Sequence, residues 1–235
     1  SFGTDWNVYV AKYRHDKVCA ISYTFDDGLA EHYTLAAPQL EQRGFRGTFF
    51  VNGSKVNKDE RRVRDTTRVT WPQLKEMAEN GHEISNHGWA HRNFAKFPYA
   101  YPNNTKQGDA MEFVARNRVG TRLKQRSVGS KRTARDLQKW LETLIRTGDW
   151  GVGMTHGLTY GYDAFRNPQL LWEHWDQVKA NEDKVWVGTF CEVVSYLKEK
   201  EAIHLRVTEK KNKLYIVPEL SLDKKLFTEP LTMVI

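Results

Sequence analysis

The sequence has few cysteines, and none of its uninterrupted apolar runs approaches the ~18 residues of a membrane-spanning helix. Its 235 residues include only Cys19 and Cys191, which are too few for a disulfide framework. Cys19 falls in an apolar strand pattern and Cys191 in a helical one, where cysteine usually packs as a small hydrophobe. We therefore expect two buried free thiols, no membrane span and no disulfide-stapled fold.

The chain also lacks an initial methionine and a recognisable signal peptide, since it begins Ser-Phe-Gly-Thr. We expect a mature or trimmed product that is secreted or periplasmic, with a cytoplasmic location left open. The oligomeric state is also left open.

Acidic residues are missing from one stretch of this basic chain, whose formal net charge is +7. Residues 116–135 contain eight Lys and Arg and no Asp or Glu. Such a segment is typical of a patch for nucleic acid or acidic polysaccharide, but also of a solvated loop. We favour the loop and do not expect nucleic acid as a partner, because no nucleic-acid motif accompanies the segment.

Hydrophobic residues make up 40% of the chain and aromatic residues 12%, enough for a substantial core. Strand-like runs alternate with stretches of helical periodicity, and this alternation is typical of a parallel sheet. We predict an α/β fold, a distorted (β/α) barrel of about seven strands. The clearest strands are expected at residues 18–25, 47–51, 82–86, 150–154 and 185–187, and the helices at 29–43, 70–80, 134–146, 168–180 and 189–200.

From residue 204 the pattern changes to strict alternation of apolar and polar residues, with a turn at Asn212. This pattern predicts a β-hairpin. We therefore expect a main domain over residues 1–203 and a small C-terminal β extension over 204–235, packed on the same domain.

Candidate catalytic side chains follow three of the predicted strands. Asp26 and Asp27 end the first one, where two charges are costly unless a metal or a proton neutralises one of them. His87 follows the third strand, with His91 four residues further on, and His156 follows the strand at 150–154. One Asp and two His suffice for a transition metal with open coordination positions. Barrels carry their chemistry at these strand ends, so the residues favour one catalytic site.

Four segments together resemble the polysaccharide deacetylase family, the NodB-homology domain of carbohydrate esterase family 4. The resemblance extends over roughly residues 18–200. An Asp-Asp-Gly turn or a His-x-x-x-His spacing alone would have an ordinary structural explanation, whereas the combination is specific. The segments are Thr24-Phe-Asp-Asp-Gly28, Gly47-Thr-Phe-Phe-Val51, Gly81-His-Glu-Ile-Ser-Asn-His87 and His87-x-x-x-His91.

The resemblance implies a role for each candidate residue. Asp27, His87 and His91 would hold a divalent metal, for which zinc is favoured and cobalt, nickel or iron remain open. The metal would polarise an acetyl carbonyl and activate water. Asp26 would be the general base, and His156 the general acid that protonates the leaving group.

Further residues are implied in oxyanion and substrate binding. Pro102 and Asn103 fall where the family places an oxyanion-binding turn, with the Asn103 N–H as the donor. Trp89, Pro102, Tyr160 and Tyr162 are candidates for binding the substrate. Aromatic rings stack on sugars, and core packing is the alternative role for the aromatic residues. Trp150, within a predicted strand, is expected to be a core residue instead.

The sequence also departs from the family pattern. Gly88 stands where the family usually has Ser or Thr, and the Arg usual before Pro102 is missing. The Asp that tunes the general acid has only one candidate here, Asp149. A short stretch joins His91 to Tyr99 where the family has a whole helix, and we expect a break or a tight connection there.

These observations predict a metal-dependent hydrolase that removes acetyl groups from a carbohydrate. The substrate would be an N-acetyl amino sugar polymer or oligomer, or an O-acetylated polysaccharide. The alternative is a carbohydrate-binding protein on a catalytically decayed deacetylase fold. The missing Arg supports this alternative, and the intact metal set opposes it.

Overall fold

The fold is built around β2 (Cys19–Asp26), a strand in which all eight residues are buried. The computed structural model describes residues 5–57, 67–91 and 125–235. The other strands of the main sheet are β3 (Thr48–Val51), β4 (Glu83–Asn86), β5 (Arg126–Ser127), β6 (Trp150–Thr155) and β7 (Val185–Val187). The strand order is β4-β3-β2-β6-β5, with β7 also paired to β2. A strand covered on both faces needs an apolar run, as β2 has.

Every pairing in this sheet is parallel. β7 pairs with the beginning of β2 and β3 with its end, so two strands share one edge of β2. This arrangement confirms the predicted α/β fold with its parallel sheet. Within the described ranges, no pairing joins β4 to β5 to close the sheet into a barrel.

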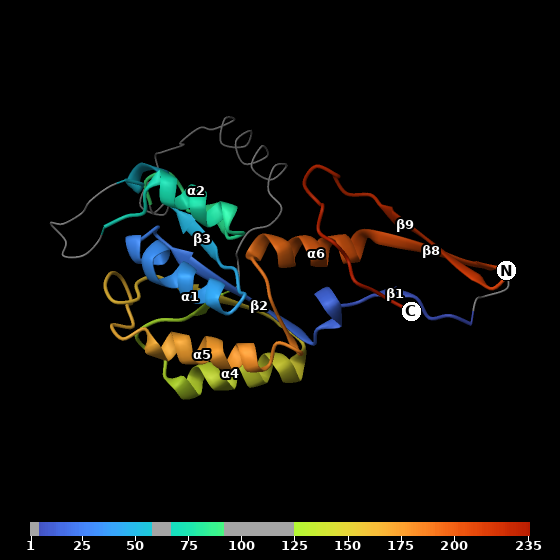
Figure 1. Ribbon diagram of the computed structural model, residues 1–235, viewed down its shortest axis with the longest axis horizontal. Coiled ribbons are helices and arrows are strands. Elements are labelled where there is room, and N and C mark those ends of the chain that lie inside the picture. The colour runs from blue at the N-terminus through green and yellow to red at the C-terminus, as the bar shows by residue number, and fades with distance from the viewer. Residues whose placement is uncertain (1–4, 58–66, 92–124) are drawn as a thin grey trace, which may run out of the picture.

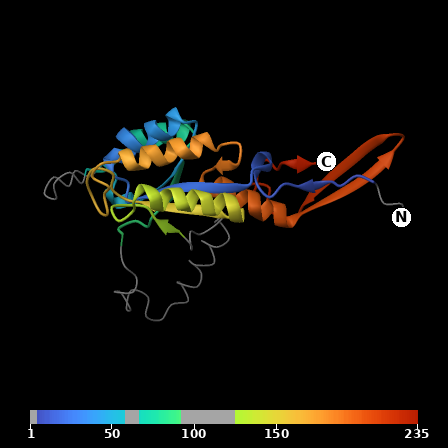
Figure 2. The same ribbon diagram turned by 90° about the horizontal axis from the view of Figure 1, so that it is seen from below.

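Helices lie around the sheet, with α4 and α5 side by side (Figure 1 and Figure 2). Their positions agree with the predicted helices to within a few residues, and the first predicted helix is divided between η2 and α1. The α-helices are α1 (Ala37–Gln42), α2 (Trp71–Glu79), α4 (Ala134–Thr147), α5 (Gln169–Ala180) and α6 (Phe190–Ala202), and the short helices are η1 (Arg14–Asp16), η2 (His32–Ala36) and η3 (Gly53–Lys55).

Threonine capping boxes start three of these helices. In each, the threonine side chain accepts a hydrogen bond from the third helical residue, whose own side chain binds back to the threonine N–H. Thr70 has this role at α2, Thr133 at α4 and Thr189 at α6. The sequence-coded start of each helix fixes where the preceding loop ends.

The first predicted helix, at residues 29–43, contains a π-helical turn. Residues His32–Ala36 form a π-helix, η2, and only Ala37–Gln42 form a regular α-helix. Pro38 has no N–H to donate to the preceding turn, and the wider π turn accommodates it. The predicted helix is therefore present over residues 30–42, and only its π-helical turn was not expected.

The predicted C-terminal hairpin is confirmed. β8 (Ile203–Lys210) and β9 (Lys213–Leu220) pair antiparallel along their whole length. Lys211 and Asn212 form a two-residue turn with φ of 49° and 59°, the left-handed conformation that tight hairpins require. In Figure 1 the hairpin extends away from the main sheet. The domain boundary at residue 203 stays a prediction.

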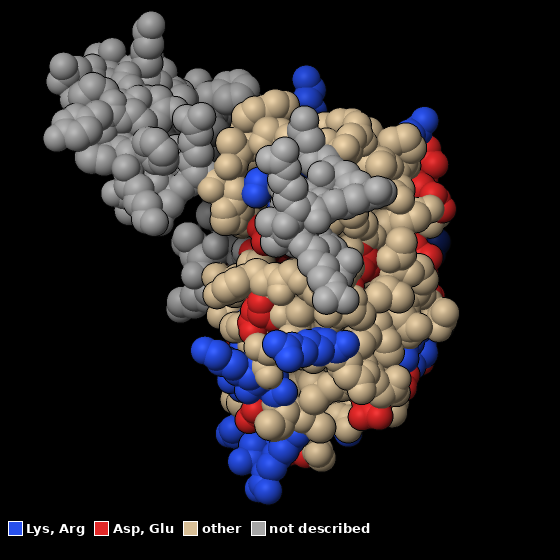
Figure 3. Space-filling view, turned by 90° about the vertical axis from the view of Figure 1, so that its left-hand side faces the viewer, with Lys and Arg blue, Asp and Glu red and all other residues tan. Residues whose placement is uncertain are grey.

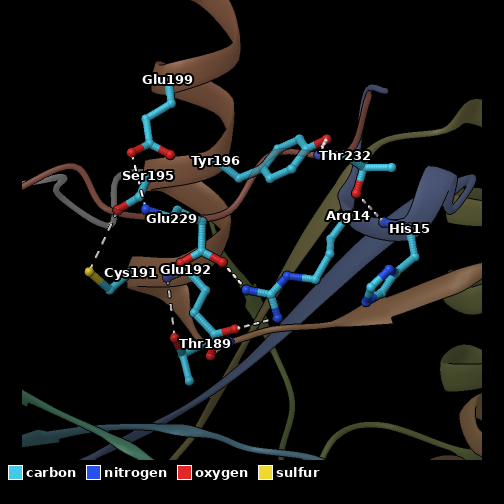
Figure 4. A network of polar contacts seen from close by, with 10 residues as sticks. All are labelled: Arg14, His15, Thr189, Cys191, Glu192, Ser195, Tyr196, Glu199, Glu229 and Thr232. Atoms are coloured by element: carbon cyan, nitrogen blue, oxygen red, sulfur yellow. Dashed lines mark hydrogen bonds and ion pairs between the residues drawn. The ribbon is translucent and has the colours of Figure 1, made fainter. Parts of the chain in front are cut away.

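The N-terminal segment contains a short strand. β1 (Tyr9–Val10) pairs antiparallel with β10 (Met233–Val234), near the other end of the chain. A two-residue strand whose partner lies this far away has no local sequence signal. Figure 4 shows polar contacts of these ends: Arg14 binds Glu192 of α6, and Arg14 and His15 N bind Glu229 and Thr232 of the C-terminal segment.

Both cysteines are free thiols, as expected, with Cys19 buried and Cys191 half-buried. Among the residues that the structure describes, every helix is too short or too polar to cross a membrane.

Candidate metal centre and active site

Asp26 and Asp27 mark the end of β2. Asp26 is the last strand residue and is only 2% exposed. The backbone then turns, because Asp27 has a φ of 83° and Gly28 a φ of 64°. Two hydrogen bonds hold the turn: Asp27 N donates to Phe50 O at 3.0 Å, and the Arg68 guanidinium donates to Asp27 O at 2.6 Å. The two carboxylates therefore leave the strand in different directions.

His87 and His91 lie beyond the end of β4, next to β3. His87 N donates to Val51 O at 2.9 Å, which continues the ladder between these strands. Two left-handed residues follow the ladder, Gly88 at φ 82° and His91 at φ 51°. This local path brings the two imidazoles face to edge, with ring centroids 4.9 Å apart.

Asn52 fixes the backbone of this histidine loop. Its side-chain amide donates to the carbonyl oxygens of His87 and Gly88, at 2.7 and 3.2 Å. Asn52 is 1% exposed and directly follows β3. Asn52 was not singled out from the sequence, because its partners lie 35 and 36 positions away. The available sequence signal for Asn52 was its position directly after an apolar strand.

Three candidate ligands meet as the strand ends predicted. Asp27 Oδ1 lies 3.3 Å from His87 Nε2 and 3.3 Å from His91 Nε2. All three ligand atoms lie within 4.8 Å of one another. Asp27 Oδ1 and His87 Nε2 are both buried without a hydrogen-bond partner, which is rare for buried polar atoms. One carboxylate oxygen and two imidazole nitrogens suit a divalent transition metal, so these residues fit the implied ion.

The electrostatics at Asp27 favour an ionised ligand. Burial raises the pKa of its carboxyl, but the histidines around it outweigh burial and lower that pKa to about 2. A carboxylate that stays charged at neutral pH is in the form that a metal requires.

The proposed acid and base come close together beside this cluster. His156 directly follows β6, and its Nε2 lies 3.7 Å from Asp26 Oδ2. This distance is longer than a hydrogen bond but short enough for strong electrostatic interaction. The Tyr162 ring packs edge-on against the His156 ring at 5.0 Å.

The aromatic candidates for substrate binding differ in exposure. Trp89 is 71% exposed, and its indole lies over Gly53, where a Cβ would come within 2.5 Å of the ring. Tyr162 is 73% exposed, and the half-buried Tyr160 has its hydroxyl 3.2 Å from Thr67 Oγ1.

Some predictions fall outside the described residues or are wrong. Pro102, Asn103 and the connection from residue 92 to Tyr99 lie outside the described ranges. Asp149 precedes β6, and its carbonyl accepts from Ala20 N near the start of β2. It is therefore at the opposite end of the strand from His156 and does not tune that imidazole. Trp150 is half-buried and donates to Ser22 Oγ at 3.0 Å, in agreement with a core role.

Comparison with known families gives a match over part of the chain. Residues 14–121 match the family described as Polysaccharide deacetylase. This match confirms the family resemblance predicted from the sequence, and it includes the three metal-ligand candidates. A comparison with curated proteins found no match.

The chain is also similar to several solved structures. A proposed polysaccharide deacetylase from Mycobacterium smegmatis is 15% identical, with a TM-score of 0.53 over 82% of this chain and 94% of that one. This likeness shows a shared fold. A family 4 acetyl xylan esterase from Clostridium thermocellum, in complex with cobalt, is 18% identical over 74% and 89%, with a TM-score of 0.44. The peptidoglycan deacetylase PdaC from Bacillus subtilis is 18% identical over 78% and 94%, with a TM-score of 0.42.

Proposed function

We propose that this protein is a metal-dependent hydrolase that removes acetyl groups from a carbohydrate, either an N-acetyl amino sugar or an O-acetylated polysaccharide. One observation carries the proposal: Asp27, His87 and His91 converge at one edge of the sheet, beside the close pair Asp26 and His156. The polysaccharide deacetylase match supports it. Zinc is the favoured ion, with cobalt, nickel and iron as alternatives.

The chemistry divides between the ion and the protein. A divalent ion held by Asp27, His87 and His91 would polarise the acetyl carbonyl and make water more acidic. Asp26 takes the proton from the attacking water, and its burial keeps that carboxylate out of bulk solvent. His156 gives a proton to the departing nitrogen or oxygen. Asp26 Oδ2 and His156 Nε2 are 3.7 Å apart. The proposed base, which accepts a proton, therefore lies next to the proposed acid, which donates one.

Substrate binding is assigned to the aromatic residues around this edge. Trp89 and Tyr162 are 71% and 73% exposed, and the Tyr162 ring packs against that of His156. Trp89 also borders a shallow groove of about 380 Å³ with Trp71. Flat exposed rings of this kind suit a pyranose face. Tyr160, Pro102 and the oxyanion donor Asn103 complete the proposed set.

The deciding experiment is acetate release from a panel of acetylated glycans. The protein would be stripped with EDTA, reloaded with Zn²⁺ or Co²⁺, and assayed on chitin oligosaccharides, acetylated xylan and peptidoglycan. Release should require the ion, and Asp26→Asn and His156→Ala should each lower turnover by about 10²-fold or more. Glycan binding without release from any substrate would instead support a decayed carbohydrate-binding protein.

A further inference from the structure

Two buried polar side chains connect the segment after β2 to the loop that carries His156. Glu31 is 2% exposed and His32 is fully buried. Glu31 is the N-cap residue of the π-helix η2, and His32 is its first residue. Burying such groups is costly unless they are hydrogen-bonded, so their partners indicate why they are there.

Glu31 binds the two residues that come second and third after His156. Its carboxylate accepts hydrogen bonds from Leu158 N, from Thr159 N at 3.0 Å and from Thr159 Oγ1 at 2.7 Å. No ion pair to Glu31 is found in the described part of the chain, so these N–H and O–H groups stabilise its charge. A buried carboxylate with this many donors is a rigid anchor for the loop.

His32 binds His156 itself, through the backbone. Its Nε2 lies 2.6 Å from the His156 carbonyl oxygen. A carbonyl accepts only, so Nε2 carries the proton. Burial lowers the pKa of the His32 imidazole and keeps it neutral, while its Nδ1 is buried without a partner. The ring packs on Phe25 and Phe49, with centroids 5.4 and 6.0 Å away.

A purely structural filler at this place would be apolar. Position 32 lies among aromatic rings, where leaving Nδ1 unsatisfied carries a desolvation cost. The compensating contact is the hydrogen bond to His156 O. Both π-helical turns and unsatisfied buried groups tend to occur at functional sites, and here they coincide with a loop that carries a candidate acid.

We propose that Glu31 and His32 are positioning residues, which hold the loop from residue 156 to 159 so that the His156 imidazole stays beside Asp26. The inference rests on the proposed function, in which His156 protonates the leaving group. We call the hydrogen bonds of Glu31 and His32 to residues 156–159 the brace. Loss of the brace should impair proton delivery by His156, while metal binding and the fold remain.

The test compares two substrates that differ in their need for an acid. An acetylated amino-sugar oligosaccharide has a poor leaving group, whereas 4-nitrophenyl acetate releases a stable phenolate that needs little protonation. With metal-loaded protein, Glu31→Gln should lower kcat on the oligosaccharide by about 10-fold or more. Metal content and KM should be unchanged, and kcat on 4-nitrophenyl acetate should stay within about 3-fold of wild type. Glu199→Gln is the matched control, because Glu199 is also 2% exposed but lies in the C-terminal half of α6.

A second variant series keeps the test independent of one substitution. His32→Leu removes the donor to His156 and should give the same substrate-selective loss, while His32→Gln retains a side-chain N–H and should restore activity. In a His156→Ala background, Glu31→Gln should cause no further loss on the oligosaccharide, since residues acting through one group are not additive. Equal losses on both substrates, or additive losses, would overturn the proposal in favour of a merely structural role.

The failure of the proposed function can be recognised separately. If His156→Ala retains full activity, His156 is not the acid. The brace is then judged by ¹⁵N-histidine NMR, in which Glu31→Gln should shift the His156 ring resonances and leave those of the buried His174 in place. Unshifted His156 resonances would overturn the brace itself.

Discussion

Asp26 and Asp27 show how one backbone angle gives adjacent identical residues different surroundings. Asp26 keeps the extended conformation of β2 and stays buried. Asp27 has a φ of 83°, an uncommon conformation for a residue with a side chain, though Asp tolerates it better than most. The turn directs the second carboxylate to His87 and His91. Such strained residues concentrate at functional sites, in agreement with a ligand role for Asp27.

The metal assignment leads to a prediction at this scale. His87→Ala should abolish zinc retention after dialysis, because it removes one of the three candidate ligands and leaves Asp27 and His91. Metal content would be measured by inductively coupled plasma mass spectrometry. Asp26→Asn is the matched control and should retain the ion. Undiminished zinc in His87→Ala would contradict the proposed centre.

Sequence reasoning found the residues that end strands, because the ends of parallel strands meet at one edge of a sheet. Asp27, His87 and His91 converge for that reason. It missed Asn52 and Glu31, whose importance depends on hydrogen bonds to residues 35 and 127 positions away. It wrongly considered Asp149 as the residue that tunes the general acid. Asp149 lies just before β6, at the opposite end of that strand from His156.

At the scale of elements, His174 joins α5 to two neighbours. Its Nε2 is hydrogen-bonded to the Tyr23 hydroxyl of β2 at 2.7 Å, and its ring stacks on Trp140 of α4. Burial lowers the pKa of His174 to about 4. The imidazole is therefore neutral inside the protein over a range in which it would be charged after unfolding.

This burial predicts a pH dependence of stability. Between pH ~6.5 and ~4 the unfolded chain binds a proton at His174 that the folded protein does not, so acid lowers stability, by about 3 kcal/mol in total. His174→Gln should flatten the curve of unfolding free energy against pH in this window, as measured by urea denaturation. His204→Gln, on the exposed face of the hairpin, is the control. An unchanged curve in His174→Gln would show that His174 is not the group responsible.

Elements with strong local signals were predictable, and those with distant partners were not. Thr70 and Thr189 begin helices because their side chains satisfy free N–H groups within the same turn. The π-helical turn at His32–Ala36, just before Pro38, could not be predicted from the spacing of apolar residues. β1 exists only because it pairs with β10, at the far end of the sequence.

At the scale of the whole molecule, charge and connectivity are unevenly distributed. Lys and Arg side chains gather over the lower part of the face in Figure 3, at the level of α4 and α5 in Figure 1. The part of the basic segment that the structure describes, residues 125–135, leads into α4. A solvated surface remains the simpler interpretation of this segment, because the candidate site is built from other residues.

A buried tyrosine of α6 contributes to holding the N-terminal segment against the main domain. Tyr196 of α6 is fully buried, and its hydroxyl donates to Ala11 O at 2.6 Å. Its ring packs on Trp186, within an apolar cluster that also includes Ala20 of β2. Ala11 is itself fully buried, so its carbonyl has no access to solvent.

This contact gives the last prediction. Tyr196→Phe removes only the hydroxyl and leaves the Ala11 carbonyl buried without its donor, which should cost about 1–3 kcal/mol of unfolding free energy. Urea denaturation would measure the loss, with Tyr215→Phe as control, since Tyr215 is 49% exposed on the hairpin. Zinc content should stay unchanged in both variants, because Tyr196 packs near the start of β2 and the metal ligands lie beyond its end. If Tyr196→Phe is as stable as Tyr215→Phe, the ends of the chain are not held to α6 through this hydrogen bond.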